Sequence, residues 1–201
     1  LVVKYDGLAA GKGGVVCSSQ KEAYKALKTL WGEYGATFPY LIEEKLEGQE
    51  LSLVCITDGK SIKMLSPSQD HKRAYDEDKG PNTGGMGAYT PVSFCNEALF
   101  ERIKAEIIGP TLKGIQEENY HYHGVIYFGV MVTEEGPKLL EYNVRFGDPE
   151  AEVILPALKS DLMEVITMCL DEKLEDYDLE YDTDAFVDVV LTSGGYPEKY
   201  S

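Results

Sequence analysis

The chain has 201 residues, of which 43% are hydrophobic, enough to bury the core of one large domain or of a domain with a subdomain. Its 19 basic and 35 acidic residues give a net charge of −16, which argues against sequence-independent nucleic-acid binding and against docking on anionic lipid. No apolar run approaches the roughly 20 residues that span a bilayer. We therefore expect no nucleic acid and no membrane as partners. The scattered cysteines favour a reducing, cytoplasmic setting.

The N-terminal part predicts two short strands and one helix. Residues 1–4 and 14–17 read as strands around a glycine-rich loop, and Ser19 and Glu22 form the capping box of a helix that ends at Gly35. The chain begins in a strand without a Met and stops just after another strand, so we expect it to be part of a longer polypeptide. The helix should bury one apolar stripe, formed by Ala23, Leu27, Leu30, Trp31 and Tyr34.

The central part predicts a strand, a hairpin and a long loop. Residues 39–44 form the strand, and Asp58-Gly59 joins strands 51–58 and 60–65 in the hairpin. Residues 66–91 are rich in Gly, Pro, Asn, Asp and Ser and predict a loop. Loops of this length are uncommon in a compact domain, and the usual reasons are function or disorder.

The C-terminal part predicts helices around a second hairpin. Pro110 should kink or divide the first of these helices, because proline removes a helical hydrogen bond. Together with the earlier elements, this order predicts an α+β fold with mixed sheets. The predicted elements are a helix over 96–118, strands over 124–133 and 138–146, a helix over 149–170 and a strand over 184–193.

The glycine-rich stretch GLAAGKGG differs from a Walker A loop. Three residues, not four, separate Gly7 from Gly11, and Lys12 is followed by Gly13. A glycine-rich turn between strands can still fold over phosphates, because its backbone N–H groups are accessible and Lys12 adds charge. A plain hairpin turn explains the same residues equally well, so both interpretations stay open.

The stretch SQDHKRAYDEDKGPNTGGMGAYTP concentrates cationic and titratable residues in an acidic protein. His71, Lys72 and Arg73 precede four glycines with Asn82 and Thr83, a composition that suits close approach to an anionic ligand. His71 is a candidate general acid or base, and a phosphate or carboxylate contact is the alternative. We therefore interpret this stretch as functional.

Two other polar stretches have ordinary explanations. His121 and His123 lack a third ligand at zinc spacing, so they read as polar residues before a strand. The stretch IEEKLEGQELS, taken alone, reads as a surface edge with solvated charges.

The stretch LLEYNVRFGDPE alternates between polar and apolar residues. Side chains along a strand point to opposite faces in turn, so Glu141, Asn143 and Arg145 should share one face. The carboxylate and amide oxygens suit a hard cation such as Mg²⁺, and the guanidinium can bind a phosphate. An internal salt-bridge network is the alternative. The other face should pack inward through Leu140, Tyr142, Val144 and Phe146.

Three of these stretches together resemble the glycinamide ribonucleotide synthetase (phosphoribosylamine–glycine ligase) family of the ATP-grasp superfamily. VVKYDGLAAGKGGVV is similar to the family's VVKxDGLAAGKGV, and the other two resemble QDHKR…GPNTGGMGAY…P and LEFNxRFGDPE. The resemblance covers nearly the whole chain and departs at Tyr5 and at Ala151-Glu152. It implies an ATP-grasp fold with a small α/β lid subdomain and a larger subdomain with a mixed or antiparallel sheet.

The resemblance also implies a reaction. ATP would phosphorylate glycine, and 5-phosphoribosylamine would attack the glycyl phosphate, in a step of purine biosynthesis that uses Mg²⁺ or Mn²⁺. In eukaryotes the family is often fused to other purine-pathway enzymes, and an isolated fragment is expected to turn over poorly. The alternatives are a related ATP-grasp ligase or carboxylase and a non-catalytic nucleotide-binding or partner-binding module. Lys4, Glu141 and Asn143 are all present, which argues against the non-catalytic module.

The family's motifs imply roles for the matching residues. Arg145, His71, Lys72 and Arg73 are the implied catalytic residues, and Glu141 and Asn143 the metal ligands. The implied ATP contacts are Lys4, Gly11, Lys12, Gly13, Glu43, Glu44, Leu46 and Glu50, the last at the ribose. The implied substrate contacts are Asp70, Asn82, Thr83, Gly84, Gly85, Met86, Gly147 and Asp148. The implied division is lid 1–40, core 41–170 with substrate loop 66–91, and linker with the start of a C-terminal domain 171–201.

Overall fold

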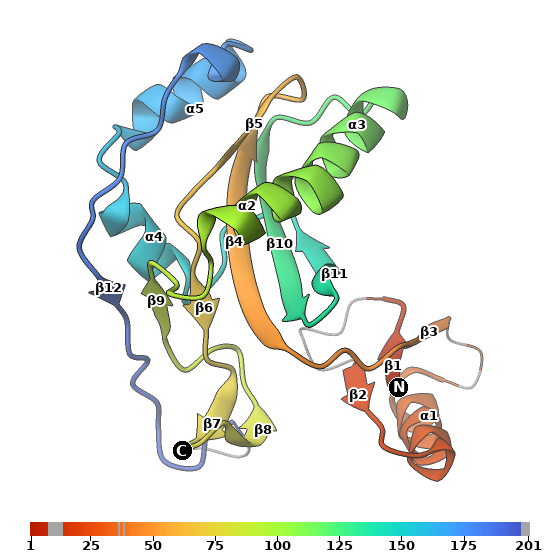
Figure 1. Cartoon of the computed structure of the whole chain (residues 1–201). Coiled ribbons are helices and arrows are strands. Elements are labelled where there is room, and N and C mark those ends of the chain that lie inside the picture. The colour runs from red at the N-terminus through yellow and green to blue at the C-terminus, as the bar shows by residue number, and fades with distance from the viewer. Residues whose placement is uncertain (8–13, 36, 38, 198–201) are drawn as a thin grey trace. The chain divides into compact units, whose positions relative to one another are not determined.

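The computed structural model of the chain describes residues 1–7, 14–35, 37 and 39–197 (Figure 1). The chain forms two compact units, residues 1–47 and 48–201. Gly11, Lys12 and Gly13 of the glycine-rich loop lie outside the described residues, so their role stays a prediction. Within the described ranges, no helix is both long and apolar enough to cross a bilayer.

The first unit combines a three-stranded antiparallel sheet with one helix. Strand β1 (Val2–Tyr5) lies between β2 (Gly14–Val16) and β3 (Tyr40–Glu43). Because β3 pairs with β1 along its whole length, residues 40–43 belong to this unit, whereas the expected boundary followed residue 40.

Helix α1 (Gln20–Tyr34) begins with the predicted cap. Ser19 Oγ accepts a hydrogen bond from the Glu22 N–H at 3.2 Å, and the Glu22 carboxylate accepts one from the Ser18 N–H at 2.8 Å. The prediction that Trp31 is buried is wrong, since its side chain is 44% exposed. Each residue of an α-helix is rotated by about 100° from the one before it, so Trp31, which follows Leu30, points away from the buried stripe. The residues buried by this helix are Ala23, Ala26, Leu27 and Leu30, with Tyr34 packed beside them.

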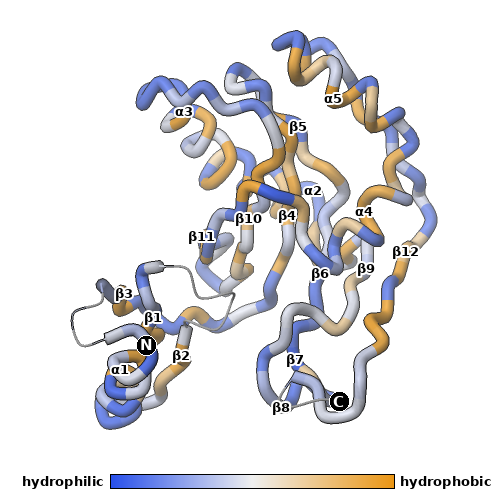
Figure 2. Tube along the Cα trace, turned by 180° about the vertical axis from the view of Figure 1, so that it is seen from behind, coloured by the Kyte–Doolittle hydropathy of each residue, from blue (hydrophilic) through white to orange (hydrophobic). Residues whose placement is uncertain are grey.

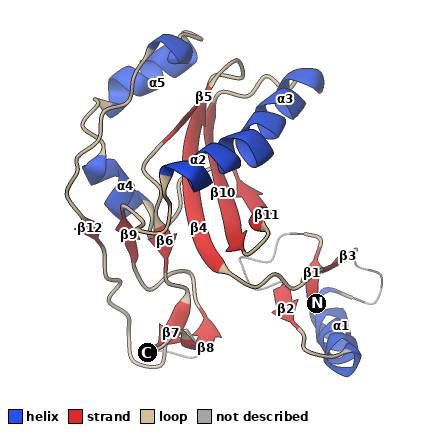
Figure 3. Ribbon diagram, in the orientation of Figure 1, coloured by secondary structure: helices blue, strands red, loops and turns tan. Residues whose placement is uncertain are grey.

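The second unit is built on a four-stranded antiparallel sheet of order β11-β10-β4-β5 (Figure 3). Both predicted hairpins are confirmed. In the first, Asp58 Oδ1 accepts hydrogen bonds from the backbone N–H groups of Lys60 at 3.0 Å and Ser61 at 2.7 Å, which fixes the turn. The strands are β4 (Gln49–Thr57), β5 (Ile62–Met64), β10 (Gly124–Thr133) and β11 (Gly136–Asn143).

One face of this sheet is covered by a helix in three segments (Figure 1). They are α2 (Glu97–Ile103), the π-helical η1 (Lys104–Ile108) and α3 (Gly109–Glu117). Pro110 lies in the first turn of α3, where its missing N–H is tolerated, and the preceding helical ladder is π-helical, so the predicted division is confirmed. The buried side chains of this core are Leu51, Leu53, Cys55, Val92, Ile103, Ile107, Ile108, Ile126, Phe128 and Val130.

The other face of the sheet packs in part against two short helices. The predicted helix over 149–170 is divided into α4 (Ala151–Ala157) and α5 (Leu162–Leu170), with extended backbone between them. Pro156 weakens the end of α4, and Asp161 accepts two backbone hydrogen bonds as the cap of α5, which explains the division. This core contains Val54, Ile56, Leu65, Ala88, Tyr127, Val153, Ile154, Val165, Cys169 and Leu174.

The segment 66–91 is more ordered than the predicted loop. The hairpin β7–β8 stands by itself, while β6 and β9 join β12 (Phe186–Val187) in a sheet of order β12-β9-β6. These pairings are too short to leave a periodic pattern in the sequence, so the prediction missed them. The strands within the segment are β6 (Gln69–Asp70), β7 (Arg73–Tyr75), β8 (Lys79–Asn82) and β9 (Ala88–Thr90).

The C-terminal segment packs onto the second unit. It contains the short helix η2 (Leu174–Asp176), and the strand predicted over 184–193 is reduced to the two residues of β12. The N–H groups of Asp188 and Val190 still bond to the backbone of the β9 segment at 2.9 and 3.0 Å. Figure 2 shows the contrast between the apolar stretch around β12 and the polar β7–β8 hairpin.

Candidate active site

The first unit brings two predicted nucleotide-binding residues into contact. The Lys4 ammonium on β1 lies 2.5 Å from the Glu43 carboxylate on the neighbouring strand β3, and both side chains are partly exposed. An exposed ion pair contributes little free energy, so the lysine can exchange its carboxylate for a phosphate at low cost. Glu44 and Leu46 follow β3, and their role at adenine stays a prediction.

In the second unit, Glu141 and Asn143 lie on the same face of β11, as predicted. They pair with Gly129 and Tyr127 of β10, whereas the Tyr142 ring between them packs on the helix-covered core. Within the part of the chain that the structure describes, neither Glu141 nor Asn143 has a side-chain hydrogen bond or ion pair. This speaks against the internal salt-bridge alternative and leaves two oxygen ligands available.

Arg145 does not continue this row. Strand β11 ends at Asn143, and the exposed Arg145 guanidinium donates a hydrogen bond to the Phe146 carbonyl oxygen at 2.7 Å. The expectation that the three side chains share one strand face is therefore wrong for Arg145, because the backbone leaves the sheet two residues earlier. Its position next to the strand end still allows a contact with an anionic ligand.

The inward face predicted for Leu140, Tyr142, Val144 and Phe146 is only partly confirmed. Gly129 pairs with Glu141, but the next residue, Val130, pairs with Leu139. Leu140 is therefore the extra residue of a β-bulge, and the alternation of side chains shifts before Glu141. Tyr142 packs edge-on against Phe128, with ring centroids 5.4 Å apart. Of the remaining three, Leu140 is half-buried, Val144 is 72% exposed, and Phe146 packs against the core on the other side of the sheet.

Lys72 connects the 66–91 segment to the sheet. Its ammonium lies 3.0 Å from the Glu50 carboxylate on β4, and the Gln69 side-chain amide donates to the Glu50 carbonyl oxygen at 2.9 Å. Burial by itself would lower the pKa of Lys72, but the Glu50 carboxylate outweighs this effect, so the pKa is raised. The predicted ribose contact and a predicted catalytic cation therefore form one partly exposed ion pair.

Beside this pair lies Asp70, a carboxylate whose pKa is strongly raised. Among the described residues, its Oδ1 is the one buried side-chain nitrogen or oxygen atom that lacks a hydrogen-bond partner. Burial, assisted by the carboxylates of Glu150, Glu50 and Asp148 and opposed by Lys72, raises the pKa of Asp70 to about 7. A buried acceptor without a donor, surrounded by negative charge, is suited to a cationic ligand group.

His71 and Arg73 are exposed and have partners of their own. The His71 ring stacks on Tyr89 with centroids 5.8 Å apart, and the Arg73 guanidinium donates to the Gly80 carbonyl oxygen at 2.8 Å inside the β7–β8 hairpin. The Arg73 side chain therefore stabilises the β7–β8 hairpin. The catalytic roles of both residues stay predictions.

Residues 82–86 fold back onto the segment that carries Lys72. Thr83 Oγ1 donates to the Lys72 carbonyl oxygen at 2.9 Å and accepts from the Gly85 N–H at 3.0 Å. The Met86 N–H donates to the His71 carbonyl oxygen at 2.8 Å. The loop is thereby fixed against the predicted catalytic residues His71 and Lys72, with Asn82 and Gly84 exposed.

Gly85 brings this loop into contact with the FGDPE turn, and a second glycine, Gly147, makes room within that turn. Gly85 has φ +126°, and a Cβ there would overlap the Pro149 ring and lie 3.0 Å from Asp70 Oδ1. A Cβ at Gly147 would overlap the Glu150 carboxylate. At Gly85, two motifs far apart in the sequence therefore meet without room for a side chain, whereas a side chain at Gly147 would require the Glu150 carboxylate to move.

Three residues that connect this site, Glu150, Ser52 and Tyr127, were not predicted from the sequence. The Glu150 carboxylate, 3% exposed, accepts a hydrogen bond from Ser52 Oγ at 2.8 Å, and Ser52 Oγ lies 3.0 Å from the Tyr127 hydroxyl. The available signal was a polar group inside an apolar run, LSLVC for Ser52 and GVIYFGV for Tyr127, since buried polar groups need partners. No local pattern shows that Ser52 and Glu150, 98 positions apart, are neighbours.

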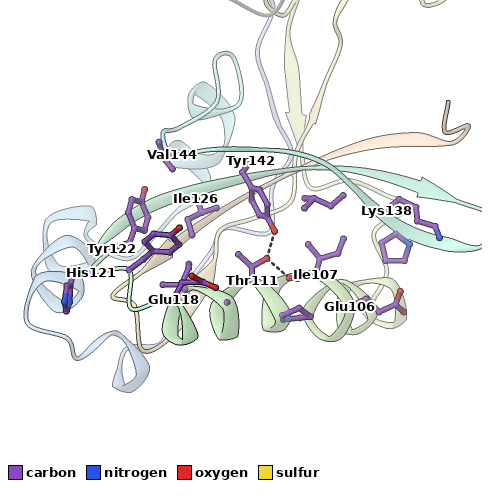
Figure 4. A pocket seen from close by; sticks show the side chains of 16 residues that line it. Glu106, Ile107, Thr111, Glu118, His121, Tyr122, Ile126, Lys138, Tyr142 and Val144 are labelled. Carbon is purple, nitrogen blue, oxygen red and sulfur yellow. Dashed lines mark hydrogen bonds between the residues drawn. The ribbon is translucent and has the colours of Figure 1, made fainter. Parts of the chain in front are cut away.

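One groove of the second unit lies away from these residues. It measures about 860 Å³ and opens between α3 and β11 on the helix-covered face (Figure 4). Its lining is mostly apolar and includes Tyr142, whose hydroxyl lies 2.8 Å from Thr111 Oγ1. Among the described residues, none of the predicted site residues lines it, so the groove is separate from the polar site.

The polar face is suited to a ligand that brings its own cation. Within the described ranges, no group of three His, Cys, Asp or Glu side chains is arranged to hold a metal ion. Glu141 and Asn143 supply two oxygens, a number that suits Mg²⁺, which commonly completes its shell with water and substrate phosphates. A polyphosphate can approach so acidic a face once a divalent cation neutralises part of its charge.

Comparison with known proteins agrees with this arrangement. The family model described as phosphoribosylglycinamide synthetase, ATP-grasp (A) domain, matches residues 1–151. The chain is 48% identical over 205 residues to phosphoribosylamine–glycine ligase of Clostridium acetobutylicum, covering all of this chain and 49% of that protein. It is 50% identical over 207 residues to the trifunctional purine biosynthetic protein adenosine-3 of Bos taurus, covering all of this chain and 20% of that protein.

A solved structure supports the same assignment. The crystal structure of phosphoribosylamine–glycine ligase from Thermotoga maritima has a TM-score of 0.83 and 37% identity, and the match covers 100% of this chain and 51% of that one. The chain thus spans about half the length, or less, of the relatives it matches. Its architecture is an ATP-grasp fold, and the chain belongs to the phosphoribosylglycinamide synthetase ATP-grasp (A) domain family.

Proposed function

We propose that the chain is the ATP-grasp part of an enzyme that ligates glycine to 5-phosphoribosylamine, forming glycinamide ribonucleotide, ADP and phosphate in purine biosynthesis. The observation that carries this proposal is the polar sheet face. There the Glu50–Lys72 pair, the unpartnered Asp70 oxygen and Glu141 come from separate motifs of the chain. The Clostridium and Thermotoga relatives, which bear the name of this ligase, support the choice of substrates.

The proposed reaction has two chemical steps. The glycine carboxylate takes the γ-phosphoryl group of ATP, and the amine of phosphoribosylamine then displaces phosphate from the glycyl phosphate. Glu141 and Asn143 would hold a divalent cation, which we propose to be Mg²⁺, with Mn²⁺ as a substitute. When bound with ATP, this cation neutralises charge on the phosphates, which is the main requirement of phosphoryl transfer.

Charged side chains of both units have roles in this scheme. In the first unit, Lys4 would exchange its pairing with Glu43 for the ATP phosphates. In the second, the carboxylates of Asp70 and Asp148 would bind the glycine ammonium, and the exposed Arg145 would contact the transferring phosphate. Positioning and charge neutralisation would thus come from charged residues of the chain's own motifs.

We further propose that the enzyme acts in the cytoplasm. All four cysteines, Cys17, Cys55, Cys95 and Cys169, are free, and three of them are buried. Burial raises the pKa of the Cys95 and Cys169 thiols, which keeps them unreactive. Unpaired cysteines of this kind suit a reducing compartment.

Phosphate release from ATP by the intact enzyme tests the proposed function. We expect release to require glycine, phosphoribosylamine and a divalent cation together. Omission of any one should reduce the steady-state rate to background. An equal rate without glycine would contradict the proposal, and an equal rate with a different amine acceptor would point to another ATP-grasp ligase.

A further inference from the structure

Glu150 and Asp58 are the two nearly fully buried charged residues of the part that the structure describes. Their surroundings differ. Oxygens of the Asp58 carboxylate accept backbone hydrogen bonds from Lys60, Ser61 and Leu174, an arrangement that holds a turn. The Glu150 carboxylate accepts a side-chain hydrogen bond from Ser52, and the Tyr127 hydroxyl also hydrogen-bonds to it. A buried carboxylate that has hydroxyl partners but no ion pair among the described residues costs free energy, so its presence calls for a role other than folding.

The first connection of Glu150 is to the sheet. Ser52 Oγ donates to its Oε1 at 2.8 Å, and the Tyr127 hydroxyl lies 3.0 Å from the same Oγ. The Ser52 backbone also exchanges hydrogen bonds of 2.8 and 3.0 Å with Ser68, two residues before Asp70. Through Ser52, the Glu150 carboxylate is thus connected to strands β4 and β10 and to the segment that carries Asp70.

The second connection is to the FGDPE turn. The Glu150 carboxylate occupies the space that a Cβ of Gly147 would need, and the Ala151 N–H donates to the Gly147 carbonyl oxygen at 3.1 Å. Asp148 follows Gly147 directly, and the next residue, Pro149, packs on Gly85. The position of the exposed Asp148 carboxylate therefore depends on what fills the space beside Gly147.

We propose that Glu150 is a positioning residue for the amino-acid substrate. By bonding to Ser52 and filling the space beside Gly147, its carboxylate holds Asp148 at a fixed place relative to Asp70, so that both carboxylates face the ammonium group of glycine. This inference rests on the proposed function and adds how the site selects its amine-bearing substrate. Glu150 itself is buried and touches neither substrate nor nucleotide.

The charges around Asp70 give the inference a pH signature. Glu50 faces Asp70 from β4, and Lys72 does so from the same segment as Asp70. Asp148 and Glu150 face it from the turn, while the packed loop 82–86 has no titratable group. Glu150 raises the pKa of Asp70, so removing its charge should lower that pKa. Since an ionised Asp70 binds an ammonium group better, the acid limb of glycine binding should move to lower pH.

The test compares Glu150→Gln and Ser52→Ala in the intact enzyme. Glu150→Gln keeps the shape and removes the charge, whereas Ser52→Ala keeps the charge and removes the hydrogen bond. Glu117→Gln is the matched control, because Glu117 is an exposed residue of α3 on the other face, paired with Lys113 at 3.5 Å. The readouts are kcat, the KM values for glycine and ATP, calorimetric titration with glycine, the pH profile and the thermal unfolding midpoint.

We expect Glu150→Gln to raise the KM for glycine about tenfold, with kcat and the KM for ATP changed less than about threefold. Its acid limb should shift to lower pH, whereas Ser52→Ala should raise the KM for glycine by a smaller factor without that shift. The control should match the wild type.

Two results would overturn the inference. One is an unchanged KM for glycine in both variants. The other is a parallel loss of kcat, glycine affinity and ATP affinity together with a lower midpoint, as a purely structural role would give. If Glu150→Gln does not fold, Ser52→Ala decides alone. If phosphate release by the wild type proves independent of glycine, the proposed function fails, and calorimetric glycine binding by wild type and variants still decides the role of Glu150.

Discussion

The helix-covered face of the sheet β11-β10-β4-β5 and its opposite face are made from the same strands but differ in what they contribute. On the first, Leu53 and Phe128 are fully buried with aliphatic neighbours from α2 and η1. On the second, Glu50 pairs with Lys72, and Glu141 has no partner among the described residues. The alternation of side chains along a strand makes this separation possible within one element.

The difference between the faces concerns free energy as well as polarity. Burial of apolar area on the helix-covered face stabilises the fold. The polar face instead carries an unpartnered buried oxygen on Asp70 and a nearly buried carboxylate on Glu150, both of which oppose folding. Substitutions of buried apolar residues on the first face should therefore change stability, and substitutions of the polar residues on the second face should change activity.

The largest expected effect is on the helix-covered face. Phe128→Ala should lower the free energy of unfolding by about 3–5 kcal/mol, because it removes a fully buried aromatic ring and leaves a cavity. Chemical denaturation of the intact enzyme measures this loss. Catalysis by the fraction that remains folded should be close to that of the wild type, and a selective loss of ATP affinity in that fraction would break the separation of the two faces.

On the polar face, Glu141→Ala should reduce turnover on the order of 100- to 1,000-fold, because it removes one of two oxygen ligands proposed for the divalent cation. The thermal midpoint should stay within a few degrees, since the side chain is exposed and has no described partner. Phosphate release over a range of Mg²⁺ concentrations gives the measurement. Wild-type turnover in this variant would refute the metal assignment.

Asp70→Asn should raise stability above neutral pH by about 1–2 kcal/mol while reducing activity. The folded-state pKa of Asp70 is raised to about 7, so its neutral form is favoured in the native state. The wild type should therefore lose stability as the pH rises from about 4, the unfolded value, through about 7. Unfolding curves at pH 5 and pH 8 compare the two proteins. If the stability of the variant depends on pH as that of the wild type does, a group other than Asp70 causes this dependence.

The smallest expected effect concerns the neighbour of Glu141 on the same strand. Tyr142→Phe should lower the free energy of unfolding by about 0.5–1 kcal/mol, because the hydrogen bond to Thr111 Oγ1 at 2.8 Å is lost while the ring still packs on Phe128. Turnover should be unchanged. Paired with Glu141→Ala, this variant tests whether adjacent residues of one strand act on different properties, and a loss of turnover would argue that the faces are coupled.

Much of the secondary structure followed from local patterns. The strand at 124–133, the hairpin at Asp58-Gly59 and the cap at Ser19 depend on neighbouring residues, and the structure confirms all three. The prediction was wrong where long-range contacts decide. Residues 66–91 pair in short strands, and the helix predicted over 149–170 is interrupted.

For the candidate site, the sequence by itself determined the family and the residues that can carry charge, because these lie in contiguous motifs such as QDHKR and FGDPE. Only the tertiary structure decided which of them meet. It joined Lys72 to Glu50, left Arg145 beyond the strand, and placed Glu150 beside Ser52 across 98 positions. The physical reason is that periodicity and capping act over a few residues, whereas proximity between distant segments depends on how whole strands and turns pack.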